Sequence, residues 1–182
     1  MIILGLDIST NCTGYTVLSS TGNDFHVLKM GHIDTSNESD IWDKIDLFEK
    51  EIWKEVDHLT IDECYIEQAL ISFHAGASNP NTITKLVMFN GLVSYIVRQK
   101  IKKNVHHVPS QTARKLCGIK VESRKKSGKP VKQQTFEQVT TRILPDLIID
   151  MTRTGKPKPY MMDRVDSFVV ARAGSLLEHK NG

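Results

Sequence analysis

The chain has 182 residues, of which 40% are hydrophobic and 25% charged, and its formal net charge is +3 at pH 7. These values predict a soluble globular protein in which residues 1–182 form one domain that is large enough to bury a core. No apolar run approaches the roughly 20 residues that cross a bilayer, and no secretory signal opens the chain, so we expect no membrane association and a cytoplasmic location.

Charge is unevenly distributed along the sequence. Acidic residues outnumber basic ones between positions 34 and 67, whereas positions 114–132 hold eight basic residues and one acidic residue. The first region repels polyanions and the second attracts them. The three cysteines lie far apart without CxxC spacing, so we expect reduced packing residues and assign no zinc site.

The first strand carries an acidic residue in an apolar setting. Residues 2–8 form a nearly continuous apolar run, typical of a strand buried on both faces of a sheet, and Asp7 interrupts it. A buried carboxylate is costly unless a cation or metal lies beside it. Turn residues at 9–14 and a β-rich run at 15–18 predict a hairpin with Asp7 near its mouth. The plain alternative is that Asp7 only caps a turn.

A second acidic strand end follows further along. Residues 25–33 predict a third antiparallel strand, and residues 41–56 predict an amphipathic helix with Trp42 and Trp53 on its apolar face. The next strand, residues 59–66, ends in Glu67. Parallel strands joined by a helical crossover end at the same edge of a sheet, which predicts that Glu67 lies near Asp7. Otherwise Glu67 is an ordinary surface residue.

The middle of the chain alternates loops and helices. Residues 69–81 predict a loop or a broken helix start, in which Phe73 either packs underneath or stacks on an unpaired base. The helix predicted at 81–98 has more than one apolar stripe, which suits packing on the sheet and on a partner subunit. A short strand at 104–108 and a brief helix at 110–116 follow.

Two basic loops flank the next predicted helix, which begins near Pro130 and stops at Pro145. We expect the first, near residues 119–131, to be a mobile surface loop, because it has too few large apolar residues to offset its ordering entropy. It is either a solvated charged loop or a nucleic-acid contact. The second lies near residues 150–160.

The last helix begins at Tyr160 and holds an acidic pair. Asp163 and Asp166 are three residues apart and share a helix face, where they repel each other unless a cation lies between them. The helix dipole offers one explanation, since it favours negative charge in the first turn. Val165 and Phe168 nonetheless hold this turn against the core, which favours a metal site.

An Asp in the first strand, a Glu at the end of the fourth strand and an acidic pair at the start of the last helix follow one another in a specific order. With these residues in this order, the sequence resembles the RuvC-type Holliday-junction resolvases of bacteria and phages, within the RNase H-like and retroviral-integrase superfamily. The stretches that carry the resemblance span nearly the whole chain and are residues 3–14, 65–68, 81–98, 108–110, 117–118 and 163–167. The resemblance implies an α/β fold, in which a mixed five-stranded sheet, an antiparallel meander followed by parallel strands, is flanked by helices.

The resemblance also implies roles for individual residues. It implies four metal-binding catalytic carboxylates, which are Asp7, Glu67, Asp163 and Asp166. Lys132 best matches the basic residue that the family has near its active site, with Lys115 or Arg114 as less direct matches, and Phe73 matches its exposed aromatic wedge. We expect DNA contacts from Phe73, Arg114, Lys115, Arg124, Lys125, Lys126 and Lys129. The basic loops are longer than in bacterial members, which suggests a phage or viral version acting in the host cytoplasm.

The chemistry of carboxylate ligands predicts Mg²⁺, for which Mn²⁺ can substitute, with two ions about 3.5–4 Å apart in each active site. The expected protein is a crossover-junction endodeoxyribonuclease, a metal-dependent endonuclease that hydrolyses phosphodiesters in four-way junctions and other branched DNA. Symmetric cuts imply a C2 homodimer, with the helix at 81–98 as its interface. The alternatives are an RNase H acting on RNA–DNA hybrids, a non-catalytic DNA-binding module, and an ATP-binding domain with a similar first hairpin.

Overall fold

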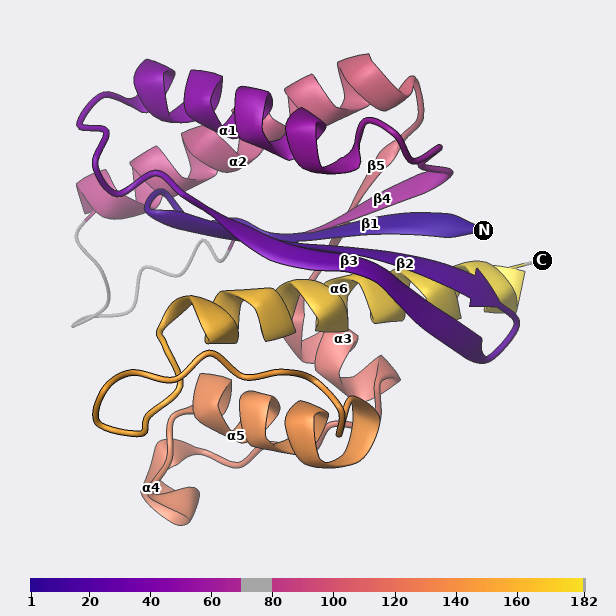
Figure 1. Ribbon diagram of the computed structural model, residues 1–182, viewed down its shortest axis with the longest axis vertical. Coiled ribbons are helices and arrows are strands. Elements are labelled where there is room, and N and C mark those ends of the chain that lie inside the picture. The colour runs from indigo at the N-terminus through magenta and orange to yellow at the C-terminus, as the bar shows by residue number, and fades with distance from the viewer. Residues whose placement is uncertain (70–79, 182) are drawn as a thin grey trace.

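The computed structural model describes residues 1–69 and 80–181 (Figure 1). Its centre is a five-stranded sheet whose strand order is β3-β2-β1-β4-β5. The strands are β1 (Ile2–Asp7), β2 (Cys12–Thr21), β3 (Asp24–Asp34), β4 (Glu63–Glu67) and β5 (Val105–Val108). β1, β2 and β3 pair antiparallel, whereas β4 pairs in parallel with both β1 and β5. The predicted meander followed by parallel strands is confirmed.

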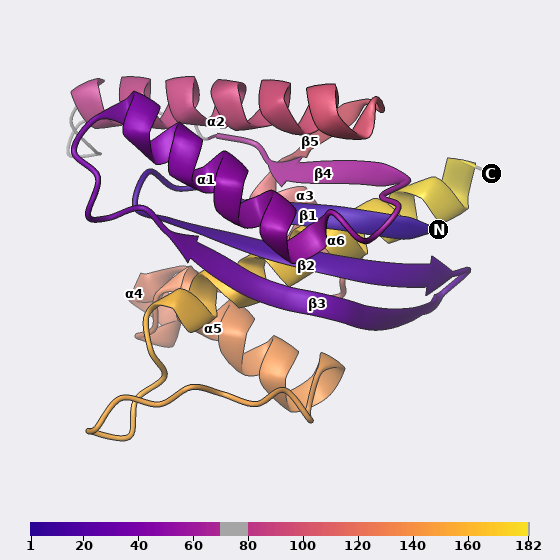
Figure 2. The same cartoon turned by 45° about the horizontal axis from the view of Figure 1, so that its top comes forward.

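Helices cover both faces of the sheet. They are α1 (Ile41–Val56), α2 (Pro80–Ile101), α3 (Ser110–Leu116), α4 (Arg124–Ser127), α5 (Val131–Gln138), the π-helix η1 (Val139–Ile143) and α6 (Tyr160–Asn181). α1 and α2 lie over one face, while α6 crosses the other with α3 and α5 behind it (Figures 1 and 2). None of these helices, within the described part of the chain, is long and apolar enough to cross a membrane.

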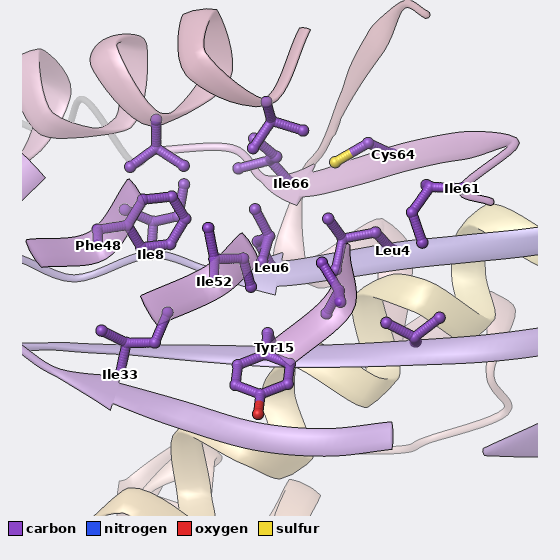
Figure 3. Close-up of a cluster of buried hydrophobic side chains, with 14 of the residues drawn as sticks. Leu4, Leu6, Ile8, Tyr15, Ile33, Phe48, Ile52, Ile61, Cys64 and Ile66 are labelled. Carbon is purple, nitrogen blue, oxygen red and sulfur yellow. The ribbon is translucent and has the colours of Figure 1, made fainter. Parts of the chain in front are cut away.

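The face beneath α1 and α2 holds one hydrophobic core. Leu4 and Leu6 of β1 point into it beside Ile66 of β4, and they meet Phe48 and Ile52 of α1 (Figure 3). The alternation of a strand sends Leu4 and Leu6 to this face and Ile3 to the other. Both faces of β1 are therefore buried, as its apolar sequence predicts.

Two glycines let α6 approach the sheet closely. A Cβ placed on Gly5 would lie 2.5 Å from the Cβ of Ala171, and one placed on Gly14 would lie 2.0 Å from the backbone oxygen of Asp163. Neither position can accept a side chain without moving backbone. Gly14 thus places the first turn of α6 directly against β2.

Several predicted details are wrong. Trp42 is 55% exposed, because the buried stripe of α1 runs through Ile45, Phe48, Ile52 and Val56 and leaves the tryptophan at its border. β4 begins at Glu63 rather than at residue 59. Phe73 and most of the loop predicted at 69–81 lie outside the described residues, so the stacking hypothesis for Phe73 stays a prediction.

The first basic loop is ordered, which corrects the expectation of a mobile segment. It contains α4, and two glutamines of α5 bind its backbone. Gln134 donates from Nε2 to the carbonyl oxygens of Glu122 and Lys129, both at 2.9 Å, and Gln138 donates to that of Lys120 at 2.6 Å. Side-chain amides supply the order that apolar burial does not, and this leaves the lysines of the loop facing solvent.

Candidate metal-dependent active site

Two of the acidic residues come from adjacent parallel strands. Leu6 of β1 pairs with Ile66 of β4, so the residues that follow, Asp7 and Glu67, reach the same edge of the sheet. Gln68 continues the β4 backbone by donating to the carbonyl of Val108, and Asn90 of α2 donates to the carbonyl of Glu67 at 3.1 Å. These bonds fix the strand end that carries the Glu67 carboxylate.

The first turns of α6 bring the other two acids to this edge. Lys132, at the start of α5, contacts three aspartates with one ammonium group. Its Nζ lies 2.7 Å from Asp163 Oδ1, 3.3 Å from Asp166 Oδ2 and 3.4 Å from Asp7 Oδ2. Oxygens from β1 and from two turns of one helix therefore converge on a single cation.

The electrostatics of this cluster show excess negative charge. Burial, with a smaller contribution from the nearby Asp7 and Asp166 carboxylates, raises the pKa of Glu67 to about 8. Burial and Asp7 likewise raise the pKa of Asp166 to about 7. The pKa of Asp7 is raised by burial against the opposing effect of Lys132. One lysine does not compensate four carboxylates.

The chemistry of this donor set suits a divalent metal ion, and its oxygens are spread around the Lys132 ammonium: among the described residues, no three of these carboxylates lie within 4.8 Å of one another. All four side chains offer carboxylate oxygens, the ligands that Mg²⁺ and Mn²⁺ prefer. The aspartate oxygens already surround one cationic group, and a further cation beside them would oppose the raised pKa values of Glu67 and Asp166. Asp7, Glu67, Asp163 and Asp166 are thus the residues that could hold a metal here.

Arg114 of α3 is a second cation near the carboxylates. Its positive charge lowers the pKa of both Glu67 and Asp166 and so opposes the effect of burial, which shows that Arg114 lies near these two carboxylates. Its Nη2 donates to Ser110 at 3.3 Å, while its Nε is buried without a hydrogen-bond partner among the described residues. Arg114 also lines a shallow pocket of about 500 Å³ with Lys115 and Lys120.

The remaining predicted DNA-binding residues lie on the surface. Lys115 of α3 is exposed, as are the three basic residues of α4, Arg124, Lys125 and Lys126. Lys129 is exposed too, and it pairs with Glu137 at 2.7 Å. The structure therefore leaves most of these charges free for solvent or a ligand.

A separate group of possible ligands lies at the other end of β4. Oxygens of Glu63 and Glu178 and a ring nitrogen of His106 lie within 4.8 Å of one another. His106 is already 3.2 Å from Glu63, and the Tyr65 hydroxyl donates to Glu178. Because β4 runs from Glu63 to Glu67, this group is not part of the cluster around Asp7.

Sequence reasoning missed a clamp beside the acidic pair. Arg164 donates from Nη1 to Asp150 at 3.1 Å and from Nε to His32 Nδ1 at 3.2 Å. Its guanidinium lies 4.8 Å from the Tyr160 ring centroid, and that ring stacks on His32 at 3.9 Å. Partners this distant in sequence leave no periodic signal. The one available signal was the position of Arg164 between the acidic residues Asp163 and Asp166.

A mixed five-stranded sheet with acids at the ends of adjacent parallel strands and in a last helix defines the RNase H-like class of folds. The chain belongs to the crossover junction endodeoxyribonuclease RuvC family, whose sequence model matches residues 3–150. That range includes Asp7, Glu67 and Lys132 and ends before the acidic pair of α6.

Individual relatives agree with this assignment. The Helicobacter pylori (strain P12) protein named crossover junction endodeoxyribonuclease RuvC is 26% identical over 174 residues, which is 94% of each chain. The structure of T. thermophilus RuvC in complex with Holliday junction substrate matches with a TM-score of 0.70 at 12% identity, covering 99% of this chain and 96% of that one. The yeast mitochondrial Holliday junction resolvase Ydc2 matches at 0.59 and 12% identity, covering 98% and 81%. The two structural matches support the fold.

Proposed function

We propose that this protein is a divalent-metal-dependent endonuclease that resolves four-way DNA junctions by phosphodiester hydrolysis. The observation that carries the proposal is the convergence of Asp7, Asp163 and Asp166 on one cation at the sheet edge where Glu67 also ends. Membership in the crossover junction endodeoxyribonuclease family supports the reaction class, and the names of the relatives support the substrate.

The four carboxylates hold the metal, with Mg²⁺ as the expected ion and two ions as the expected number. Bound there, the metal supplies a nucleophile at neutral pH and neutralises charge on the attacked phosphate and the leaving oxygen. Asp7 lies near both Glu67 and Asp166, whose pKa values it raises, so it would be a central ligand of such a metal centre. The backbone contact between Gly14 and Asp163 keeps the α6 ligands against the sheet.

Lys132 and Arg114 act on the DNA phosphate. The Lys132 side chain is 45% exposed, so its ammonium group can reach a substrate while remaining beside the carboxylates. A preformed cation at a site of developing negative charge stabilises the transition state. Arg114 lies near the same acids and offers a second positive charge to the phosphate.

DNA binding beyond the cut site rests on exposed positive charge. The lysines and arginine of residues 115–129 face solvent on a backbone that Gln134 and Gln138 hold in place. Such side chains bind phosphates by releasing counterions, which gives affinity that depends on salt and not on sequence.

The proposed assembly is a C2 homodimer formed through α2. Val87, Met88 and Tyr95 are large apolar residues exposed on this helix, with Tyr95 exposed by 62%. Gly91 lies among them with open space around its Cβ position, so a second helix can approach there. Two active sites related by a two-fold axis match the symmetry of a four-way junction.

The test is a cleavage assay with a panel of labelled substrates in Mg²⁺, which includes a four-way junction, linear duplex, a flap and an RNA–DNA hybrid. We expect paired cuts in the junction, little cleavage of the duplex, and none in EDTA. Preferred cutting of the RNA strand of the hybrid would replace the proposal with RNase H activity. Binding of the junction without metal-dependent cleavage would indicate a DNA-binding module.

A further inference from the structure

The segment between η1 and α6 forms a short β-hairpin, which we call the 150–158 hairpin. Lys158 N donates to the carbonyl of Asp150 at 2.8 Å, and Thr152 N donates to that of Lys156 at 2.7 Å, with an antiparallel bridge between Met151 and Pro157. The turn closes with Gly155, whose φ of 75° lies in the left-handed region that glycine adopts without strain. The second basic loop is thus a defined element.

The hairpin presents positive charge to solvent. Arg153, Lys156 and Lys158 are all exposed, and within residues 1–69 and 80–181 no carboxylate lies at salt-bridge distance from any of them. Its one acidic residue, Asp150, is already occupied by Arg164 and by the Tyr160 hydroxyl, each at 3.1 Å. The charge that the hairpin offers to a ligand is therefore purely cationic.

A clamp fixes the base of this hairpin next to the candidate metal ligands. Arg164 joins Asp150 of the hairpin to His32 of β3. The Tyr160 ring stacks on His32 and lies beneath the Arg164 guanidinium. Arg164 directly follows Asp163, so the same helical turn holds both the hairpin and a carboxylate. In both views the hairpin and α4 lie at the end of the molecule where α6 begins, and they project from it in different directions (Figures 1 and 2).

We propose that the 150–158 hairpin is a preformed contact for the phosphodiester backbone of the DNA substrate, separate from the basic 115–129 segment, and that Arg164, Asp150 and Tyr160 are its positioning residues. The inference rests on the proposed junction-cleaving function. An anchored hairpin binds phosphates without first having to become ordered, which lowers the entropic cost of association. With α4, it gives the DNA two separate contacts around one cut site.

The first test measures the dependence of junction affinity on salt, under Ca²⁺ conditions in which the wild-type protein binds without cutting. The variant R153Q/K156Q/K158Q should reduce the magnitude of the slope of log K against log salt by about 2 to 3, because about 0.9 counterion is released per phosphate contact. The matched control K50Q/K103Q/K180Q removes the same charge from exposed positions outside the hairpin and should leave the slope within error. Equal slopes for the two triple variants would overturn the proposal.

The second test separates anchoring from charge. Asp150→Ala removes a negative charge, so electrostatics alone would tighten DNA binding, whereas loss of the clamp should weaken it by about two- to tenfold with an unchanged salt slope. Tyr160→Phe keeps the ring and removes one bond to Asp150, and it should weaken binding less. Tighter or unchanged binding by both variants would overturn the anchoring role, with circular dichroism confirming that each is folded.

Failure of the function and failure of the hairpin proposal are distinguishable. If the wild-type protein neither binds nor cuts a four-way junction, the proposed function is wrong. If the wild-type protein binds and cuts normally while the hairpin variants match the wild type, only the hairpin proposal is wrong.

Discussion

The Nζ of Lys132 lies 2.7 Å from Oδ1 of Asp163, and this ion pair joins the start of α5 to the start of α6. The same ammonium group contacts Asp7 and Asp166, so it compensates part of the repulsion within the cluster. Its pKa is raised above the ordinary lysine value, because the attraction of the carboxylates outweighs the effect of burial. Lys132 therefore stays charged at any pH at which the enzyme works.

Lys132→Ala should lower the single-turnover rate of junction cleavage by about 10²–10³, the loss typical of removing one preorganised transition-state donor. Junction affinity should change much less, because the basic 115–129 segment is intact. Rapid-quench kinetics at saturating protein check this. Lys103→Ala, an exposed lysine outside the site, serves as the control. An unchanged single-turnover rate for Lys132→Ala would remove the residue from the mechanism.

The metal-free protein should become less stable as pH rises. Glu67 and Asp166 have folded-state pKa values of about 8 and about 7, above their ordinary values of 4.5 and 3.8, so at these two sites the folded state binds more protons than the unfolded state between about pH 4 and pH 8. The free energy of unfolding therefore falls as pH rises through this window. Thermal melts at pH 5, 6, 7 and 8 in EDTA should show a falling Tm.

Divalent metal should reverse this trend, because ions that bind ionised carboxylates stabilise the folded state. Melts in Mg²⁺ should show the largest gain in Tm at pH 8. The variant E67Q/D166N should flatten the metal-free profile and lose the gain from Mg²⁺. A Tm that rises with pH in EDTA for the wild type would contradict the charge state inferred for the cluster.

Gly14→Ala should destabilise the protein, because the added methyl would lie 2.0 Å from the backbone oxygen of Asp163 and would push α6 from β2. Overpacking of this kind costs about 1–3 kcal/mol. Because the displaced turn carries Asp163, Mg²⁺ affinity should fall as well. Urea denaturation and metal titration followed by Tm measure the two effects. If the Gly14→Ala variant showed the stability and the metal response of the wild type, α6 would be free to shift away from β2 and the close contact would not be required.

Tyr95→Asp should dissociate the proposed dimer, since it places a charge on the exposed apolar face of α2 without affecting a buried contact within the protomer. Sedimentation velocity should show a dimer for the wild type and a monomer for the variant, with each protomer retaining its fold. The monomer should nick junctions and lose the paired cuts. A wild-type monomer at all concentrations would contradict the dimer.

The parts of this fold that sequence could predict are those with local patterning. The apolar runs around Leu6 and Ile66 predict buried strands, and an acid at the end of each, Asp7 and Glu67, stands out because charge is rare there. The expectation that Asp163 and Asp166 share one face follows from their three-residue spacing on a helix. The parallel register then brings β1 and β4 to one edge, which is a rule of topology and not of these particular residues.

What sequence could not predict depends on contacts between distant polar groups. The backbone of the basic segment is ordered by Gln134, whose amide gives no periodic signal. The clamp on the 150–158 hairpin needs His32 and Arg164, which are 132 residues apart. The prediction that Trp42 packs on the core was wrong for a simpler reason. A residue at the border of a helical stripe is buried only if the sheet extends beneath it.

The most direct measurement of the central claim is Mg²⁺-dependent junction cleavage by Asp7→Asn beside junction binding in Ca²⁺. Asparagine keeps the size of the side chain and removes the charge that the metal requires, so cleavage should fall by more than about 100-fold, beyond the loss typical of groups that only support a ligand. Binding should stay near the wild-type value. Cleavage by Asp7→Asn at the wild-type rate, or wild-type cleavage that persists in EDTA, would contradict a metal centre built on these four acids.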